Sequence, residues 1–594
     1  ISSHTFDFDD THLKTIIHPA GPVASALLPL AEHIGASGRE VIDALVLGID
    51  VACRMGNTVY PEHYDRGWHI TGTTGMLGSA AACARLLKLN TQQTAMALGI
   101  AASQPIGLRE QFGTMTKPFH PGGAARAGLM AALPDIRWVT DAALVRQRSR
   151  DFFWYSPVLK RQLNGVSADV VAEARDEADV VRILAACHAR RIPVTPRGAG
   201  TGNYGQAMPL HGGVVLDVSA LDKLLWAKPG VMRAQAGAKL IALDEQTRQQ
   251  VGGELRFHPS TKRTATIGGF VAGGSAGAGS CMWGSFREPG NVLGLRVITM
   301  EETPRILELR GAEIEKANHA YGTNGIITEV EMPLAPAYEW VDVMMAFPSF
   351  MEAARFAEAV TLADGIVKKL ATVVAAPVPQ QYFRHFEGRI PAGKSVTMLM
   401  IAAPFLEAFE ALKIKHGATD AEIYRCPTEE AAVPLYEHAW NHTTLQALKL
   451  DRGITYLQTL FPPPSHMALV EKMEALFGDE VPMHLEFVRF GGHVTCFGLQ
   501  LVRYTSEERL AEIIRIHEAN GCPVFNPHAF SLEEGGMKRV DARQLAFKKE
   551  ADPLGLLNPG KMLAWDDPEW SPDRPRTHYM YGDPDAPEVE ERLD

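Results

Sequence analysis

Glycine and small polar residues crowd the stretch PRGAGTGNYGQA, residues 196–207, beside one arginine. Gly200, Gly202 and Gly205 satisfy the G-x-G-x-x-G pattern of dinucleotide-binding loops, in which the main chain approaches a phosphate too closely for a Cβ atom. The run IPVTP ahead of the loop predicts a strand, but MPLHGG and then VVLDVS follow, which leaves no room for the helix of a Rossmann fold. A Walker loop is excluded because no G-K-[ST] follows. The loop is therefore predicted to join two strands, either as a phosphate-binding nest or as a glycine-rich turn.

A second segment rich in Gly, Ser and Thr lies downstream, HPSTKRTATIGGFVAGGSAGAGSCMWG at residues 258–284. In each of the two segments, backbone N–H groups could surround a phosphate. Two such segments in a mixed α/β context suit one long ligand with two phosphates. Two more motifs follow: HAYGTNGIITEVEMPL is a loop that leads into a predicted strand, and ADPLGLLNPGKM lies near the C-terminus.

These four segments, in this order, resemble the FAD-binding domain of the vanillyl-alcohol-oxidase superfamily, also called PCMH-type or FAD-linked oxidases, over about residues 155–565. The resemblance implies that the first loop binds the pyrophosphate of FAD through backbone N–H groups and that the C-terminal motif closes over the flavin ring. Some members hold FAD covalently through a histidine in the first loop. Since this loop has none, non-covalent FAD is predicted. The implied cofactor-binding residues are Pro196, Arg197, Gly198, Ala199, Gly200, Thr201, Gly202, Asn203, Tyr204, Gly205, Pro259, Ser260, Thr266, Ile267, Gly268, Gly269, Gly277, Ile326, Ile327 and Asn558.

Strand-like runs (WVDVMMAF, SVTMLMIA, ITYLQTLF) alternate with helix-like runs between the third and fourth motifs, which predicts an antiparallel sheet with helices. The predicted fold class is multidomain: an all-α N-terminal fragment, then an α+β PCMH-type FAD-binding domain with an α+β substrate (cap) domain. The predicted boundaries are 1–133 for the helical fragment, 134–337 for the FAD-binding domain, 338–530 for the cap, 531–565 for a C-terminal return to the FAD-binding domain and 566–594 for an acidic tail.

The segment MHLEFVRFGGHVTCFGLQL, residues 483–501, resembles the G-H-x-G-D-G-N-L-H segment of D-2-hydroxyacid dehydrogenases in the same superfamily, where two histidines help to hold a divalent metal. His493 matches the first histidine, but Gln500 and Cys496 replace the second histidine and the aspartate, so no metal is predicted. His493 and His484 are the candidate bases for a hydroxyl proton, and Arg489 is the candidate clamp for a carboxylate. The alternative is that His484 and its strand neighbour Glu486 lie on a solvated face.

The first 133 residues differ from the rest in their sequence pattern. They show helical periodicity, and small residues such as Ala and Gly occupy the expected helix contacts. They resemble the N-terminal part of the MmgE/PrpD family, which includes 2-methylcitrate dehydratase and cis-aconitate decarboxylase. The resemblance stops near AGLMAAL, short of the family's full helical domain, so the fragment is predicted to carry only a vestigial lyase site. The matching site residues are Asp7, Thr11, His18, His69 and Lys117.

The composition of the chain argues against some classes of partner and location. The net charge of −11 argues against nucleic acid as a partner, and no apolar run is long enough for a membrane span. Seven cysteines without C-x-x-C spacing are typical of a reduced, cytoplasmic protein.

The leading hypothesis is an FAD-dependent oxidoreductase that oxidises the CH–OH group of a small 2-hydroxy acid or aromatic alcohol by hydride transfer to flavin N5. The alternatives are an MmgE/PrpD-type lyase or isomerase acting on a tricarboxylate-like acid, and an N-terminal fragment that serves as a non-catalytic interaction module. The electron acceptor and homo-oligomer formation are left open.

Overall fold

The computed structural model of the chain describes residues 10–103, 130, 133–274, 276–286, 288–536, 538, 540, 542–567 and 569. Asp7 and Lys117 of the predicted lyase site lie outside the described residues. No helix of the described part is both long and apolar enough to cross a membrane.

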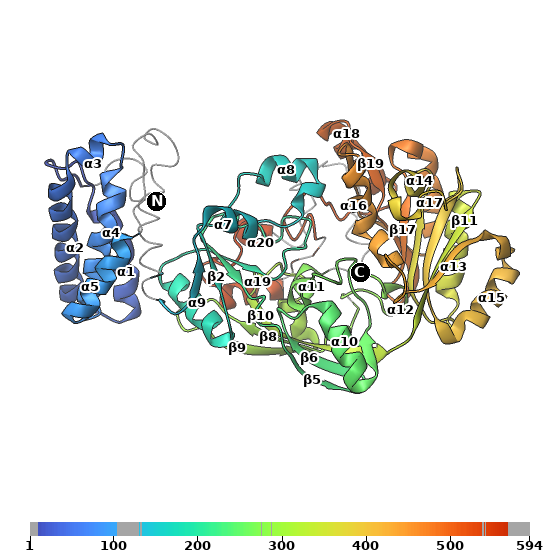
Figure 1. Cartoon of the computed structure of the whole chain (residues 1–594), viewed down its shortest axis with the longest axis horizontal. Helices are drawn as coiled ribbons and strands as arrows, with labels where there is room; N and C mark the ends of the chain where they lie inside the picture. The colour runs from blue at the N-terminus through green and yellow to red at the C-terminus, as the bar shows by residue number, and fades with distance from the viewer. Residues whose placement is uncertain are drawn as a thin grey trace.

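The N-terminal part is a bundle of helices at one end of the molecule, drawn in blue in Figure 1. Its helices are α1 (Ala20–His33), α2 (Gly38–Val59), α3 (Glu62–Asp65), α4 (Ile70–Leu86) and α5 (Thr91–Ala102). Ser37 and Glu40 form a capping box that starts α2. A Cβ atom on Gly48 of α2 would lie 2.7 Å from the carbonyl oxygen of Gly78 of α4. Small residues therefore let these two helices pack backbone to backbone, as the sequence predicts.

The first sheet of the FAD-binding region has the strand order β1-β2-β4-β3. The strands are β1 (Arg137–Val139), β2 (Val170–Glu173), β3 (Val194–Arg197) and β4 (Val214–Asp217), with helices α7 (Ala142–Arg148), α8 (Pro157–Leu163) and α9 (Glu177–Ala189) and the 3-10 turn η3 (Phe153–Tyr155). β3 pairs directly with β4 in parallel, and the connection between them contains no helix. The glycine-rich loop thus joins two neighbouring strands, which confirms that the chain has no Rossmann unit here.

The second sheet has the order β5-β6-β10-β8-β9, and β7 pairs with β10. Its strands are β5 (Leu224–Lys228), β6 (Val231–Gln235), β7 (Gly253–Leu255), β8 (Gly294–Ile298), β9 (Ile306–Arg310) and β10 (Ile326–Pro336), with helices α10 (Leu240–Val251), α11 (Ile267–Gly273) and α12 (Ser280–Trp283). The C-terminal segment, with α19 (Ala542–Ala551) and α20 (Leu563–Asp566), comes back to this region. There the Val194 amide of β3 donates to the carbonyl oxygen of Leu556 at 2.8 Å.

The cap is an antiparallel sheet in the order β14-β11-β13-β12-β17-β18-β16. Its strands are β11 (Trp340–Phe347), β12 (Lys368–Val374), β13 (Ser395–Ala402), β14 (Glu422–Pro427), β16 (Thr459–Phe461), β17 (His484–Phe490) and β18 (His493–Gly498); β15 (Ile454–Tyr456) and β19 (Leu501–Arg503) form a separate pair. The helices are α13 (Phe350–Leu362), α14 (Val378–Tyr382), α15 (Leu406–Lys415), α16 (Asn441–Leu450), α17 (His466–Phe477) and α18 (Glu507–Ala519). This is the antiparallel α+β layer that the sequence predicts, and it lies at the end of the molecule opposite the bundle (Figure 1).

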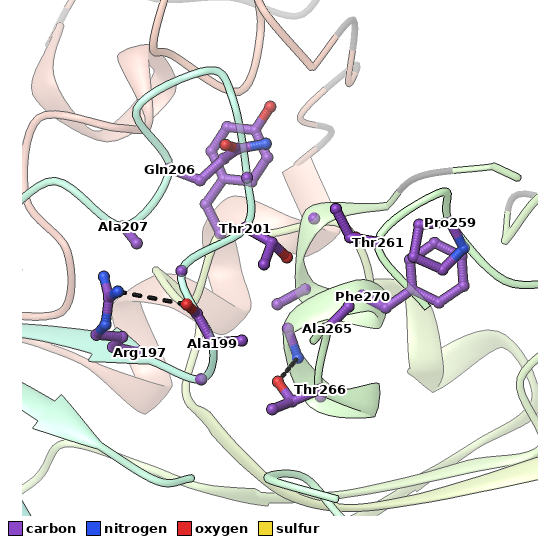
Figure 2. A pocket seen from close by; sticks show the side chains of 18 of the residues that line it. Arg197, Ala199, Thr201, Gln206, Ala207, Pro259, Thr261, Ala265, Thr266 and Phe270 are labelled. Carbon is purple, nitrogen blue, oxygen red and sulfur yellow. Dashed lines mark hydrogen bonds between the residues drawn. The ribbon is translucent and has the colours of Figure 1, made fainter. Parts of the chain in front are cut away.

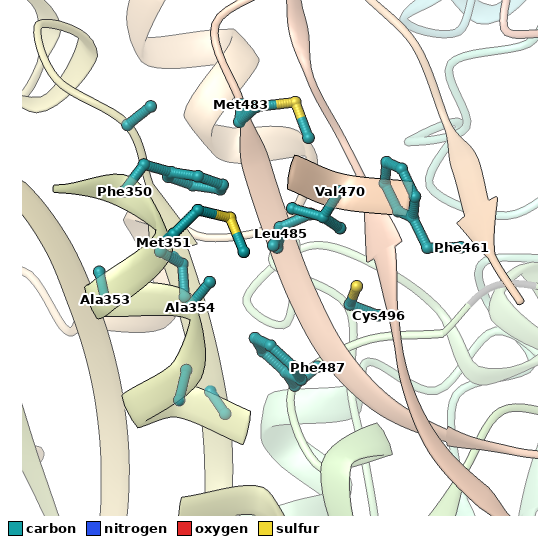
Figure 3. Packing of buried hydrophobic residues seen from close by; sticks show 14 of the residues in the cluster. Phe350, Met351, Ala353, Ala354, Phe461, Val470, Met483, Leu485, Phe487 and Cys496 are labelled. Atoms are coloured by element: carbon teal, nitrogen blue, oxygen red, sulfur yellow. The ribbon is translucent and has the colours of Figure 1, made fainter. Parts of the chain in front are cut away.

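The largest core of the cap lies between its sheet and helices. Phe487 of β17 faces α13, where Ala353 and Ala354 leave room for it, and Phe461 of β16 lies farther from this helix, near Val470 and Cys496 (Figure 3). A buried ion pair ties the cap to the FAD-binding region, because Lys369 Nζ of β12 donates to Glu254 of β7 at 2.6 Å.

Candidate functional site

A cavity of about 170 Å³ opens where the glycine-rich loop leaves β3. We call it the cofactor chamber. Its walls come from the glycine-rich loop, the segment that leads into α11, the start of β10 and the start of α16 in the cap. Its lining residues are Phe152, Tyr155, Pro196–Asn203, Gln206, Ala207, Val218, Ala236, Pro259–Thr261, Ala265, Thr266, Gly268–Phe270, Ala272, Gly273, Ala276, Tyr321, Gly322, Gly325–Ile327 and Trp440–His442.

The amides of the glycine-rich loop are available to a ligand. Within the part of the chain that the structure describes, no backbone N–H from Gly198 to Gly202 donates a hydrogen bond to a protein acceptor. Buried amides nearly always have partners, so a run of such amides along a cavity wall is a binding surface for an acceptor-rich group. Gly200 adopts a φ of +67°, which turns the loop back on itself and which side chains rarely tolerate.

Ala199 of the glycine-rich loop lies near Thr266 at the start of α11 (Figure 2), and the neighbouring Gly198 has no space for a side chain. A Cβ atom on Gly198 would lie 2.2 Å from Thr266 Oγ1, and one on Gly268 would lie 2.9 Å from the Ala236 carbonyl oxygen. The first amides of α11 are already used: Ile267 and Gly268 donate to backbone oxygens of Ala238 and Ala236, and Gly269 donates to Thr266 Oγ1 at 3.3 Å. The acceptor-binding capacity of the chamber therefore comes from the glycine-rich loop rather than from the helix.

Three buried ionisable side chains form hydrogen bonds with the backbone of the glycine-rich loop and of the segment next to it. Asp151 accepts hydrogen bonds from the amides of Phe153 and Ala207 at 3.0 and 3.1 Å. Lys561 Nζ donates to the Gly205 carbonyl oxygen at 2.6 Å. Burial raises the pKa of Asp151 to about 6 and lowers the pKa of Lys561 to about 7. The third, Arg197, donates from Nη1 to the Arg150 carbonyl oxygen at 2.6 Å, and burial lowers its pKa.

All but five of the predicted cofactor-binding residues line this chamber. The exceptions are Tyr204, Gly205, Ile267, Gly277 and Asn558. Asn558 Nδ2 donates to the carbonyl oxygens of Gln206 and Tyr321 at 2.8 and 2.7 Å. It thus fastens the glycine-rich loop to the segment before β10 instead of forming part of the lining.

A second cavity, of about 100 Å³, shares part of its wall with the first and lies against the cap. We call it the substrate chamber. Its residues outside the shared wall include four apolar side chains from the cap side and several polar ones. The shared residues are Asn203, Gly273, Ala276, Tyr321, Trp440 and Asn441, and the others are Tyr204, Gly274, Ser285, His319, Gln458, Thr459, Phe490, Phe497, Leu499, Phe525, Gly535 and Gly536.

His319 is the histidine among the described residues that line the substrate chamber, and the sequence analysis gives it no role. It is buried and adopts a φ of +50°, as does Tyr321, whose ring lies 5.8 Å away. A non-glycine residue in this conformation is rare and tends to occur at functional sites. The ring is closely packed, since a Cβ atom on Gly274 would lie 2.0 Å from it and one on Gly536 would lie 2.8 Å from its Nε2. The available signal was its place at the head of the HAYGTNG motif.

Hydrogen bonds join the glycine-rich loop to the cap. Asn203 Nδ2 donates to the hydroxyl oxygen of Tyr456 at 2.5 Å, and the Tyr204 hydroxyl donates to Gln458 Oε1. Gln458 Nε2 in turn donates to Asn441 Oδ1 at 2.9 Å. Tyr456 is fully buried, which raises its pKa well above the ordinary value. It therefore acts as a structural link and does not line either chamber.

The structure does not bring the three predicted catalytic residues to the chambers. His493 is exposed at the start of β18, next to the turn of the β17–β18 hairpin. Arg489 forms an ion pair with the exposed Asp364. His484 is fully buried inside the cap sheet. None of the three appears in the lining of either chamber.

The expected solvated face at His484 and Glu486 is wrong. Both side chains are buried, and His484 Nε2 lies 2.9 Å from Glu486 Oε1. The reason is that β17 lies inside the sheet, between β12 and β18, with the turn before α16 over these side chains. Alternation placed the two residues on one face correctly but gave no information about what covers that face.

The described residues of the predicted lyase site form a small polar cluster. Thr11 Oγ1 lies 3.4 Å from His18 Nδ1, and the His18 amide donates to Thr71 Oγ1 at 3.1 Å. His69 is buried at the start of α4. Among the described residues, no three His, Cys, Asp or Glu side chains come together to hold a metal ion.

Comparisons with known proteins find relatives of both parts. Residues 1–134 match the family model of the MmgE/PrpD N-terminal domain, and residues 168–307 match that of an FAD binding domain. The glycolate oxidase subunit GlcD of Bacillus subtilis is 26% identical over 441 residues, which are 67% of this chain and 89% of the relative. Human cis-aconitate decarboxylase is 36% identical over 138 residues, which are 22% of this chain but only 28% of that enzyme.

The fold of the larger part also has a solved counterpart. An alkyldihydroxyacetonephosphate synthase structure superposes with a TM-score of 0.55 at 15% identity and covers 72% of this chain and 84% of its own. The architecture, the free amides of the glycine-rich loop and the family matches agree. The chain therefore joins an MmgE/PrpD N-terminal domain to the FAD binding domain of an FAD-linked oxidoreductase.

Proposed function

We propose that this protein oxidises the CH–OH group of a small 2-hydroxy acid or aromatic alcohol, with FAD in the cofactor chamber as the hydride acceptor. The observation that carries the proposal is the junction of the two chambers. A loop with five free amides, Gly198 to Gly202, lines one chamber, and a buried histidine, His319, lies in the other. Trp440 and Asn441 belong to both walls, so the two chambers adjoin at these residues.

The residues present fit FAD. The amides of the glycine-rich loop would hold the pyrophosphate, because a Cβ atom at Gly198 or Gly202 would collide with Thr266 or Gln206 and only main chain reaches the cavity there. Ile326 and Ile327 would contact the cofactor from the start of β10. The loop contains no histidine, which favours non-covalent binding. When bound, FAD supplies an acceptor for a hydride.

His319 is the proposed general base. Oxidation of an alcohol releases the hydroxyl proton together with the hydride, and a neutral imidazole can take that proton. Its close packing against Gly274 and Gly536 fixes the ring in place. Phe490, Phe497 and Phe525 give the substrate chamber an apolar part of its wall, which would exclude water from the reacting groups.

The substrate class rests on the similarity to the glycolate oxidase subunit and on the size of the substrate chamber. A molecule with a few non-hydrogen atoms fits a cavity of about 100 Å³. The aromatic side favours an apolar or aromatic group beside the reacting carbon.

The test is a visible absorption spectrum of the purified protein, followed by anaerobic addition of glycolate, D-lactate, mandelate and benzyl alcohol in turn. Bleaching of a two-banded flavin spectrum by any of these supports the proposed reaction. A flavin spectrum that none of them bleaches contradicts the substrate class. A protein that stays colourless after incubation with FAD contradicts the whole proposal.

A further inference from the structure

Trp440 forms a wall common to both chambers, and its backbone is strained. It precedes α16 with φ +53° and ψ −141°, a combination that suits glycine rather than a bulky side chain. A backbone of this kind persists only where the surroundings hold it. The residues that hold Trp440 therefore determine the shape of the junction between the chambers.

One buried carboxylate holds this turn. Glu486 Oε1 of β17 accepts a hydrogen bond from the Trp440 amide at 2.5 Å. The same carboxylate is held from two other sides: Thr372 Oγ1 of β12 donates to Oε2 at 2.5 Å, and His484 Nε2 lies 2.9 Å from Oε1. Glu486 lines neither chamber itself.

The histidine ring is itself held at both nitrogens. His484 Nδ1 lies 3.1 Å from the Leu499 carbonyl oxygen, and Nε2 faces the Glu486 carboxylate. The ring therefore fixes the position of the carboxylate under the Trp440 amide.

We propose that Glu486, supported by His484 and Thr372, is a positioning residue that fixes Trp440 and thereby the geometry of the flavin and substrate sites. The inference rests on the proposed function only in taking the two chambers as those sites. In this proposal His484 supports Glu486 structurally, whereas the sequence analysis expects it to accept a proton.

The test compares four variants. Glu486→Leu removes the acceptor, Glu486→Gln keeps it as an amide oxygen, and Thr372→Val removes one support without touching the carboxylate. The matched control is Asp342→Leu, because Asp342 of β11 is equally buried and accepts from Thr428 Oγ1 at 2.6 Å and from the Leu435 amide at 2.8 Å. Leu435 lines neither chamber.

The first measurement is hydrogen exchange of the peptide that contains Trp440, which needs no cofactor. Loss of the anchor should speed exchange at this amide by about tenfold or more in Glu486→Leu, since a buried hydrogen bond is lost. Thr372→Val should give a smaller increase, and Glu486→Gln should stay within about threefold of the parent because its amide oxygen still accepts.

The second measurement is the visible circular dichroism and FAD dissociation constant of the holoenzyme. Glu486→Leu should change the flavin dichroism and weaken FAD binding by about tenfold, whereas Asp342→Leu should leave the flavin dichroism unchanged. Parent-like exchange and dichroism in Glu486→Leu overturn the inference, and so does an equal change in Asp342→Leu. If Glu486→Leu does not fold, parent-like exchange in Thr372→Val overturns it. A parent protein that no alcohol reduces contradicts the proposed reaction but leaves these readouts intact.

Discussion

At the scale of single residues, the proposed reaction depends on His319. Replacing it with asparagine keeps a polar side chain of similar reach but removes the base, so kcat should fall by about 10²- to 10⁴-fold, the usual contribution of a positioned general base. The FAD dissociation constant should change little, because His319 lines the substrate chamber and not the cofactor chamber. Steady-state kinetics and a flavin titration measure the two effects.

His493→Asn is the matched control for this prediction. His493 lies on an exposed hairpin, and its replacement should leave kcat within about twofold, as for most surface substitutions. An equal loss in both variants, or a loss in His493→Asn alone, would return the role of base to the residue that the sequence first indicates.

A second residue, His528, should impose a pH dependence on stability. It is fully buried between Ser156 Oγ at 2.7 Å and the Tyr456 carbonyl oxygen at 3.1 Å, and burial lowers its pKa to about 3. As pH falls below about 6.5, the unfolded chain binds a proton that the folded chain refuses until about pH 3. The stability that His528 contributes is therefore complete above pH 6.5 and is lost as pH falls, by up to about 1.4 kcal/mol per pH unit.

His528→Gln should make this pH dependence shallower while it lowers stability by a constant amount at neutral pH. The measurement is the thermal midpoint of parent and variant at intervals between pH 7 and pH 4.5. Parallel curves for the two proteins would show that His528 titrates normally in the fold.

At the scale of elements, the glycine-rich loop is the part whose shape is most closely specified. Gly200 has a φ of +67°, and an added Cβ atom would lie 2.3 Å from the buried Arg197 guanidinium. Gly200→Ala should therefore weaken FAD binding by at least about tenfold, because backbone strain and a collision both distort the loop. Gly230→Ala is the control: Gly230 has a φ of +80° in the turn between β5 and β6, where an added Cβ atom meets nothing within 4 Å. Flavin fluorescence titration should show parent-like binding there.

The loop also shows how far local sequence can predict the site. The residues MPLHGG after it excluded a helix, and the strands on both sides followed from apolar runs, so its place between β3 and β4 was predictable. His319 and Trp440 were not, because their importance arises only where segments distant in sequence meet around one cavity. For β17, alternation gave the shared face of His484 and Glu486 but not its burial, which depends on partner strands and on the turn at Trp440.

At the scale of the whole molecule, two parts of different kinship share one chain. The bundle meets the FAD-binding region near the end of α9, where Arg190 lies beside Cys83 of α4 and burial raises the pKa of that thiol to about 11. On its other side, α2 exposes Ile42 and Val46 by 62% and 61%. All the described residues that line the two chambers follow Asp151 in the sequence. Among the described residues, the larger part alone therefore supplies the chamber walls.

Deletion of residues 1–133 should therefore leave the FAD dissociation constant and kcat within about threefold of the full chain, since no chamber residue is removed. Solubility or oligomeric state should change instead, because the deletion removes the exposed apolar face of α2 and uncovers the surface of α9 that α1 contacts. Flavin titration and light scattering measure the two effects.

The full chain should not consume cis-aconitate, because the matched segment spans only 28% of the human decarboxylase. Lys117→Ala should therefore leave the rate of cis-aconitate consumption unchanged. Turnover of cis-aconitate that Lys117→Ala abolishes would instead show that the N-terminal domain is an active lyase.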